Sequence, residues 1–523
     1  MSERVDRRKF ITGVIGGAVG GLIVGFAGGY LSAPAKAIVK TVTATKTTTI
    51  GGGAPVTETV TKTVVPTEVK PEEMPLPPEW EQMRDEQKKW LKEVGSKYAG
   101  HELLMTSEAT PPSRAIQVLT DGYFTPLTGI KVTWELTPLE HVLEKITMET
   151  STRAGKYSHF YQDQAWIARF HKDTVDPRTM WKEHPELTLP HFMPEDFLPP
   201  LVEHIAMFPP ADKMVGIVCD IPIFLTIYRK DIFDKEGLPI PKDPDTYMEV
   251  VKKINDKYAP ETYGTTGQLK GGHYSLYCDW TWYHWTHGAG HYAAGTGEPI
   301  VNEPEGVDAL NYLLELMNYM PPGVTTWDWS GEAESFAAGR AAIYSAWGEF
   351  FPMYDTPAKS KIVGLADSTT VPKEYKLRDP KTVAYLEMPR AAHQGGSIYA
   401  LSAYTKERDA GWIFLQWATN WDTQALSSVL GGGASPVRKT SYIDPRVTAK
   451  YKVCPGTTRH FLTTYESIMY RMGTEPHYPE HPEVADMIAH ALADLFAGKF
   501  SDAKSTLDFM AKRMKEIVKT PVY

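Results

Sequence analysis

The sequence predicts an α/β protein, and its composition and the order of its strand and helix signals support that class. The chain has 523 residues, of which 42% are hydrophobic and 23% charged, as is typical of a globular protein that buries a core. From about residue 80 onward, short apolar runs bounded by polar residues alternate with longer runs of helical spacing. Such alternation favours sheets covered by helices, with ligands bound at the carboxyl ends of the strands.

Each strand is assigned to a short apolar or alternating run, and each helix to a run whose apolar residues recur every three or four positions. Strands are expected at 102–106, 129–134, 158–161, 221–228 and 341–345. Helices are expected at 80–97, 115–123, 139–150, 245–258, 303–319, 332–338, 410–421 and 482–497.

Residues 1–37 predict an export signal. Arg7 and Arg8 precede an apolar run from Phe10 to Leu31, the arrangement of a twin-arginine signal. A run of roughly 22 residues is long enough to span about 30 Å of hydrocarbon. The small residues Ala35 and Ala37 offer a cleavage site. Cleavage and retention as a membrane anchor both stay open, and in either case the bulk of the chain is expected outside the cell.

Residues 38–78 predict a disordered stalk rich in threonine and proline. Thr-Val and Thr-Lys-Thr recur, Gly51-Gly52-Gly53 follows, and four prolines close the segment between Pro71 and Pro78. No periodic apolar face develops, so an extended tether without a core of its own is expected.

Charge and short motifs exclude several function classes. The formal net charge is −9, and no basic run occurs beyond the N-terminus, so no nucleic-acid partner is expected. The cysteines Cys219, Cys278 and Cys454 form no CxxC pair, which argues against a disulfide scaffold or a cysteine-based zinc site. No Gly-Lys-Ser/Thr follows Gly431-Gly432-Gly433, so the chain has no P-loop for ATP.

Six segments, in order, resemble extracellular solute-binding proteins of ABC importers, in their sugar-binding group. They are Phe124–Val132 (FTPLTGIKV), Asp163–Ile167 (DQAWI), Ile227–Phe233 (IYRKDIF), Ser335–Ile343 (SFAAGRAAI), Gly395–Ser402 (GGSIYALS) continuing to Phe414, and Ala434–Arg438 (ASPVR). The resemblance covers roughly residues 102–518. Each segment alone is a weak signal, but six in the same order are hard to produce by chance.

The resemblance implies a two-lobed fold of the periplasmic-binding-protein type II class, which holds its ligand between lobes that close by hinge motion. The implied parts are lobe 1 at 79–219 and 391–428, lobe 2 at 220–390 and 429–523, and crossovers near 218–222 and 389–394. The implied function is to capture a sugar, oligosaccharide or sugar alcohol outside the cell and deliver it to the transmembrane permease subunits. A separate ATPase subunit would bind ATP. No catalytic residue, cofactor or metal is implied.

A sugar site needs flat aromatic surfaces for the apolar faces of the sugar and polar groups for its hydroxyls. The chain has 14 Trp and 27 Tyr to supply such surfaces. The candidate ligand residues lie at predicted strand ends, near the crossovers or in an aromatic cluster: Ser107, Glu108, Asp163, Trp166, Asp220, Trp280, Trp282, Trp347, Gly395, Gly396 and Ser397. Trp166 and Trp347 are favoured as ligand-stacking rings over core rings. For Asp220, bonding to ligand and bonding to hinge backbone stay equally open.

The aromatic cluster between Tyr277 and Trp285 holds five aromatic residues and a histidine within nine positions. Because one helix face cannot bury so many rings, some are expected to face the cleft. Trp280 and Trp282 are equal candidates.

Histidines offer a rival metal chemistry. His284, His287 and His291 could converge on an ion together with Asp279. The intervening glycines argue against a rigid helix that presents them, so structural or cleft-lining histidines are favoured.

An exported carbohydrate-active enzyme is the alternative function. Glu332 and Glu334, with Asp328, could act as the acid and base of a glycoside hydrolase, which requires two carboxyls facing one bond. Residues two apart on a helix do not face each other, so this pair is expected to be charge at a helix N-terminus. A non-sugar solute such as a peptide or polyamine stays open as well.

Overall fold

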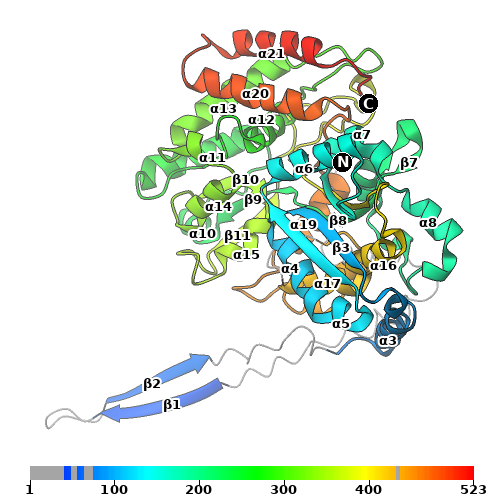
Figure 1. Cartoon of the computed structure of the whole chain (residues 1–523). Coiled ribbons are helices and arrows are strands. Elements are labelled where there is room, and N and C mark those ends of the chain that lie inside the picture. Colours follow the sequence, from blue (N-terminus) through cyan, green and yellow to red (C-terminus); the bar gives the residue numbers. More distant parts are fainter. Residues whose placement is uncertain (1–40, 49–55, 64–74, 431–435) are drawn as a thin grey trace. The chain divides into compact units, whose positions relative to one another are not determined.

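The computed structural model describes residues 41–48, 56–63, 75–430 and 436–523 (Figure 1). The chain divides after Pro75 into two compact units. The predicted signal at 1–37 lies outside the described residues. Within the described ranges, no helix combines the length and the apolar character needed to cross a membrane.

In the first unit, strands β1 (Thr41–Thr48) and β2 (Val56–Thr63) pair antiparallel along their whole length. The prediction of a disordered stalk is wrong for these two segments. Threonine and valine are branched at Cβ and favour extended backbone, and two such runs can satisfy their peptide groups by pairing.

The second unit, residues 76–523, contains a five-stranded sheet in the order β4-β3-β5-β13-β8. Its strands are β3 (Glu102–Glu108), β4 (Lys131–Thr137), β5 (His159–Asp163), β8 (Ile217–Asp220) and β13 (Ser397–Leu401). β3 runs parallel to β4 and β5, whereas β13 runs antiparallel to β5 and β8. The first four strands therefore end, and β13 begins, at one edge of the sheet.

β3 is longer than its apolar run suggests. Ser107 and Glu108 pair in register with Leu136 and Thr137 of β4 and so belong to the strand instead of following it. The ladder continues because β4 itself extends to Thr137 and offers backbone partners to polar residues as readily as to apolar ones.

Helices cover the five-stranded sheet. α6 (Leu139–Thr152) contacts β3 and β5, and α16 (Arg408–Thr419) contacts β13 and β8. α17 (Trp421–Leu430) follows α16 and packs on α4 (Pro111–Leu119). α3 (Pro78–Glu93) contacts α5 (Thr125–Thr128).

A three-stranded antiparallel sheet has the order β10-β9-β11. Its strands are β9 (Phe224–Arg229), β10 (Ile343–Trp347) and β11 (Ala366–Thr370). The chain leaves the five-stranded sheet after Asp220 and enters this one at Phe224, within three residues. It returns to the larger sheet at Ser397 by way of β12 (Ala392–His393), which pairs with β14 (Met472–Gly473).

Helices near the smaller sheet are α10 (Lys230–Glu236), α11 (Pro244–Tyr258), α14 (Trp329–Ala337), α15 (Phe351–Tyr354) and α19 (Phe461–Tyr470). Beyond them, α12 (Tyr274–Thr286) and α13 (Pro304–Leu316) pack against α20 (His481–Phe496) and α21 (Ala503–Ile517) at one end of the unit (Figure 1). The short elements are α7 (Ile167–Phe170), α8 (Pro177–Glu183), α9 (Pro199–Leu201), α18 (Pro445–Thr448), β6 (Met207–Phe208) and β7 (Lys213–Met214).

The aromatic cluster forms α12, and every residue from Ser275 to Thr286 is buried. The argument that one helix could not bury these rings is therefore wrong. It assumed a helix with one face in solvent, whereas α12 is covered by α13 and α20 and also contacts β12.

Candidate functional site

Carboxyl side chains gather at the strand-end edge of the five-stranded sheet. Asp163 is the last residue of β5 and Asp220 the last of β8, and both pair in register with Ser397, the first residue of β13. Glu108 ends β3, the neighbour of β5 on its other side. The sheet order therefore sets Glu108, Asp163, Ser397 and Asp220 side by side.

A fourth carboxyl comes from the smaller sheet. Glu349 lies two residues beyond Trp347, the end of β10, in the 3₁₀ turn Gly348–Phe350. Burial, and then the negative charge of Glu349, raises the pKa of both Glu108 and Asp220 well above the usual range. The charge of Glu349 therefore acts on the other sheet, and we call Glu108, Asp163, Asp220 and Glu349 the cleft carboxyls.

The cleft carboxyls hold protons more tightly than exposed carboxyls do. Burial, followed by the charge of Glu475, raises the pKa of Asp163 to about 8. Burial raises the pKa of Glu349 to about 7. Low polarity penalises the charged form, so Asp163 and Glu349 titrate near neutral pH.

Few protein donors reach the cleft carboxyls. Glu108 accepts a hydrogen bond from the Tyr161 hydroxyl at 3.3 Å. Asp163 Oδ1 accepts one from the backbone N–H of Ala165 at 2.8 Å. Across the described ranges, no Lys, Arg or His side chain forms an ion pair with any of the four.

Two tryptophans lie at the same strand ends. The Trp347 ring meets Phe224 of β9 edge-on, with ring centroids 4.4 Å apart, and a Cβ atom added to Gly395 would lie 3.2 Å from that ring. Trp166 ends the 3₁₀ turn Gln164–Trp166, directly after Asp163 and β5. Both tryptophans are 5% exposed, so the two sheets are closed over this site.

The segment Gln394–Gly396 joins the two sheets at the site. The N–H of Gly395 donates to the carbonyl of Pro222 at 2.8 Å, and the carbonyl of Gly396 accepts from Gln164 N–H at 3.0 Å. Gln394 Oε1 accepts from the Gly396 N–H at 2.6 Å, while its Nε2 is buried without an acceptor. A Cβ on Gly396 would lie 2.2 Å from the Ile205 side chain and 2.8 Å from Gln394 Oε1, so a larger residue would displace both side chains.

The structure brings eight of the predicted residues together and places three differently. The ring contacts of Trp280 are to Tyr277, His284 and His291 in the interior around α12. Trp282 lies behind Phe224, with ring centroids 6.4 Å apart. The Ser107 hydroxyl is hydrogen-bonded to that of Ser113 at 3.0 Å.

A buried network around Glu475 adjoins the site, and no motif or periodicity predicted it. Glu475 accepts hydrogen bonds from Gln164 at 2.8 Å, from Tyr274 at 2.8 Å, from His393 at 2.6 Å and from His481 at 3.1 Å. These donors come from four separate segments, and Glu475 itself lies in an irregular stretch without a motif. The network links the residue next to Asp163 with α12, β12 and α20.

One group of side chains has the donor types of a metal site. Cys278 Sγ, a nitrogen of His393 and a carboxyl oxygen of Glu475 lie within 4.8 Å of one another, all buried. Thiolate, imidazole and carboxylate together suit zinc. The oxygens of Glu475 already accept the hydrogen bonds described above, so hydrogen bonding alone satisfies this carboxyl.

The histidines His284 and His291 form hydrogen bonds that stabilise the fold. His284 is hydrogen-bonded through Nε2 to the carbonyl of Gly290 at 3.1 Å, and His291 Nδ1 to Glu387 at 2.8 Å. The sequence favoured such structural roles.

The acidic residues of α14 do not face one bond. Asp328 caps the helix by accepting from the N–H groups of Ser330 and Gly331. Glu332 is buried and Glu334 exposed, so the two side chains point in different directions. Glu332 lies in the first turn of α14, where charge was expected, but that side of the helix packs into the interior.

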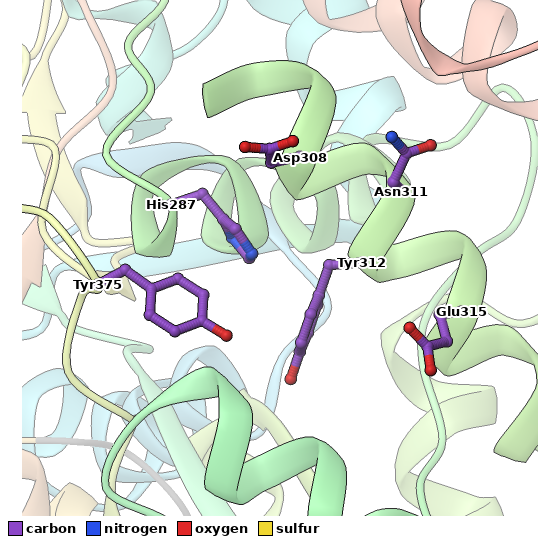
Figure 2. A pocket seen from close by; sticks show the side chains of 6 residues that line it. All are labelled: His287, Asp308, Asn311, Tyr312, Glu315 and Tyr375. Carbon is purple, nitrogen blue, oxygen red and sulfur yellow. The ribbon is translucent and has the colours of Figure 1, made fainter. Parts of the chain in front are cut away.

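A separate cavity of about 430 Å³ lies among helices (Figure 2). Its lining residues are His287, Asp308, Asn311, Tyr312, Glu315 and Tyr375. Four of them come from α13, and none is a predicted ligand residue. Two tyrosine hydroxyls at this cavity are already engaged, that of Tyr312 with the Pro244 carbonyl and that of Tyr375 with Asp245.

Comparison with known proteins gives a consistent result. Residues 123–453 match the family described as bacterial extracellular solute-binding protein. The erythritol/L-threitol-binding protein of Mycolicibacterium smegmatis is 21% identical over 413 residues, covering 74% of this chain and 80% of its own. A probable amino-acid ABC transporter periplasmic-binding protein of Sinorhizobium fredii is 22% identical over 329 residues, covering 62% of this chain and 70% of its own.

A solved structure shares the fold. The ABC transporter solute-binding protein of Agrobacterium radiobacter, in complex with ribitol, superposes with a TM-score of 0.68 at 23% identity. The superposition covers 80% of this chain and 99% of that one.

Proposed function

The chain belongs to the family of bacterial extracellular solute-binding proteins, and we propose that it captures a sugar, oligosaccharide or sugar alcohol for an ABC importer. The family is one of binding proteins, not enzymes, and its members act outside the cell. The similar proteins named for erythritol and threitol and crystallised with ribitol support a polyhydroxylated ligand.

The observation that carries the proposal is the meeting of acceptors and rings at the facing strand ends. Asp163 and Asp220 flank Ser397 on one sheet, and Trp347 ends a strand of the other. Carboxylates accept hydrogen bonds from ligand hydroxyls, and an indole face covers the C–H face of a sugar. Ligand binds while the sheets are apart, and closure then buries it.

The assignment of lobes, export and transporter partners follows from the sequence. The lobes are residues 79–219 with 391–428 and residues 220–390 with 429–523, hinged near 218–222 and 389–394. A twin-arginine signal exports the chain, which stays on the extracellular face through the N-terminal apolar segment or is released after Ala37. The closed protein docks on permease subunits, and a separate ATPase subunit binds ATP.

Titration calorimetry with ribitol, erythritol, mannitol, tagatose and maltose tests the proposal. At least one should bind with a micromolar or lower dissociation constant, about −8 kcal/mol or stronger. Asp220→Asn should weaken that binding, whereas Glu334→Gln, an exposed carboxyl on α14, should not. Conversion of a bound oligosaccharide to products, or loss of affinity in both variants alike, would overturn the proposal.

A further inference from the structure

The cleft carboxyls lack the positive charge that buried carboxylates require. Asp163, Asp220 and Glu349 are 4%, 3% and 8% exposed, and Glu108 is half-buried. None forms an ion pair within the part of the chain that the structure describes. A buried charge without a partner costs several kcal/mol, so in the empty protein these carboxyls hold protons, and a ligand cation could take the place of those protons.

A single metal ion does not meet this need. Calcium and magnesium bind carboxyl oxygens at about 2.0–2.6 Å, which requires those oxygens to converge. Among the described residues, the three-residue group whose donor atoms lie within 4.8 Å of one another is Cys278, His393 and Glu475, and it includes no cleft carboxyl. The carboxyls are spread along an edge of the sheet and therefore suit a longer ligand with several donors.

Two further features fit a ligand that carries both a cation and hydroxyls. Gln394 Nε2 is a donor without an acceptor, and its side chain is 1% exposed beside Gly396. A ligand hydroxyl could accept from it. Trp166 and Trp347 supply ring faces of the kind that attract ammonium groups as well as C–H faces.

We propose that the solute carries a protonated amine beside its hydroxyls, as an amino sugar or an amino polyol does, and that Glu349, two residues beyond β10, holds the ammonium. This inference rests on the proposed function and narrows the class of solute. A neutral polyol leaves the cleft carboxyls protonated, whereas an ammonium stabilises their ionised form and donates hydrogen bonds to it.

The repulsion between the cleft carboxyls also acts on their pKa values. After burial, the charges of Glu349, Asp220 and Asp163 raise the pKa of Glu108, and those of Glu349 and Asp163 raise the pKa of Asp220. A bound cation acts on both groups in the opposite direction.

Calorimetry on matched pairs tests the inference. The pairs are glucosamine with glucose, galactosamine with galactose, and 1-amino-1-deoxysorbitol with sorbitol, with each N-acetylated amine as a neutral control of larger size. Putrescine serves as a cation without hydroxyls. For at least one pair, we expect the amine to bind at least tenfold tighter than both its parent and its N-acetyl form.

Substitutions test which carboxyl causes the preference for the amine. Glu349→Gln should reduce the preference for the amine at least fivefold, and Glu334→Gln should leave it unchanged, with circular dichroism confirming that both variants are folded. If a neutral parent binds as tightly as its amine, the inference fails while the proposed function stands. If putrescine alone binds, the proposed function fails with it. If nothing in this panel binds while ribitol, erythritol, mannitol, tagatose or maltose does, only the inference fails.

Discussion

Buried carboxyls occur in two environments in this molecule. Asp196, Asp355 and Asp444 are paired with arginines, and we call them the paired carboxyls. Arg446 lies 2.6 Å from Asp444 and 2.6 Å from Asp422, while Arg459 lies 2.7 Å from Asp355. Asp163, Asp220 and Glu349 are buried to a similar degree, Glu108 is half-buried, and among the described residues none of the four forms an ion pair.

This difference distinguishes carboxyls that are buried as part of the stable fold from carboxyls that are buried to bind a ligand. A paired carboxyl is satisfied within the folded chain, and its arginine holds distant segments together. A cleft carboxyl is costly in the closed, empty protein and is satisfied by a ligand. The stabilisation that the cleft carboxyls lack in the empty protein is therefore available for ligand binding. Substitutions that affect the paired and the cleft carboxyls differently test this comparison.

The largest effect is expected from Arg446→Ala. It leaves Asp444 buried without its partner, so the free energy of unfolding should fall by about 3–5 kcal/mol. Glu349→Gln, which removes a cleft carboxyl, should leave that free energy unchanged or raise it. Urea unfolding of both variants at pH 7 measures this. A loss in Glu349→Gln as large as in Arg446→Ala would contradict the comparison.

The pH dependence of unfolding should show the raised pKa of Glu349. Its pKa of about 7 in the fold exceeds the unfolded value of about 4.3, so the native state binds more protons and stability falls as pH rises between these values. Buried histidines such as His159, whose pKa burial lowers to about 4, act in the opposite direction up to about pH 6.5.

The measurable quantity is therefore the difference between wild type and Glu349→Gln. The variant should gain about 2–3 kcal/mol relative to wild type from pH 4.5 to 7, then stay level. Thermal or urea unfolding at several pH values checks this, and parallel curves would show that Glu349 ionises normally.

Trp347→Ala and Trp412→Ala compare a cleft ring with a core ring. Trp347→Ala should weaken ligand binding 10- to 100-fold, about 1.4–2.7 kcal/mol. Trp412 is fully buried against Trp181, so its loss should cost about 3–5 kcal/mol of stability and leave the affinity of the folded protein intact. The reverse pattern in calorimetry and unfolding would place Trp347 in the core.

The smallest effect is expected from Gly395→Ala. The new methyl would lie 3.2 Å from two atoms of the Trp347 ring and shift it by a few tenths of an ångström. Affinity should fall about two- to fivefold, or roughly 0.4–1 kcal/mol. Gly122→Ala, where no atom lies within 4 Å of the added carbon, is the control and should bind normally.

Much of the fold could be predicted because its signals are local. The strand at 343–347 and the helices at 139–152, 244–258 and 481–496 lie within a few residues of their predicted positions. The helix Tyr274–Thr286 was missed because it is buried on every side and so has no polar face to give periodicity. The resemblance to solute-binding proteins is confirmed by the family match over residues 123–453.

The site was only partly predictable. A predicted strand end pointed to Asp163, and the expected crossover between lobes pointed to Asp220. The family resemblance pointed to Trp347, just past a predicted strand. Glu349 and Glu475 were missed, since neither belongs to a motif and each meets its neighbours through contacts distant in sequence. The ligand-binding roles of Trp280, Trp282 and Ser107 stay predictions.

By itself, the sequence determined many of the strands and helices, the family and the supply of aromatic and acidic residues. These follow from periodicity, composition and short motifs, which are properties of neighbouring residues. Only the tertiary structure decided which rings lie at the strand ends and which carboxyls have an arginine. Whether a buried charge is paired depends on segments far apart in the chain, as Glu108 and Glu349 are. No local sequence pattern shows whether folding also brings a cationic side chain to them.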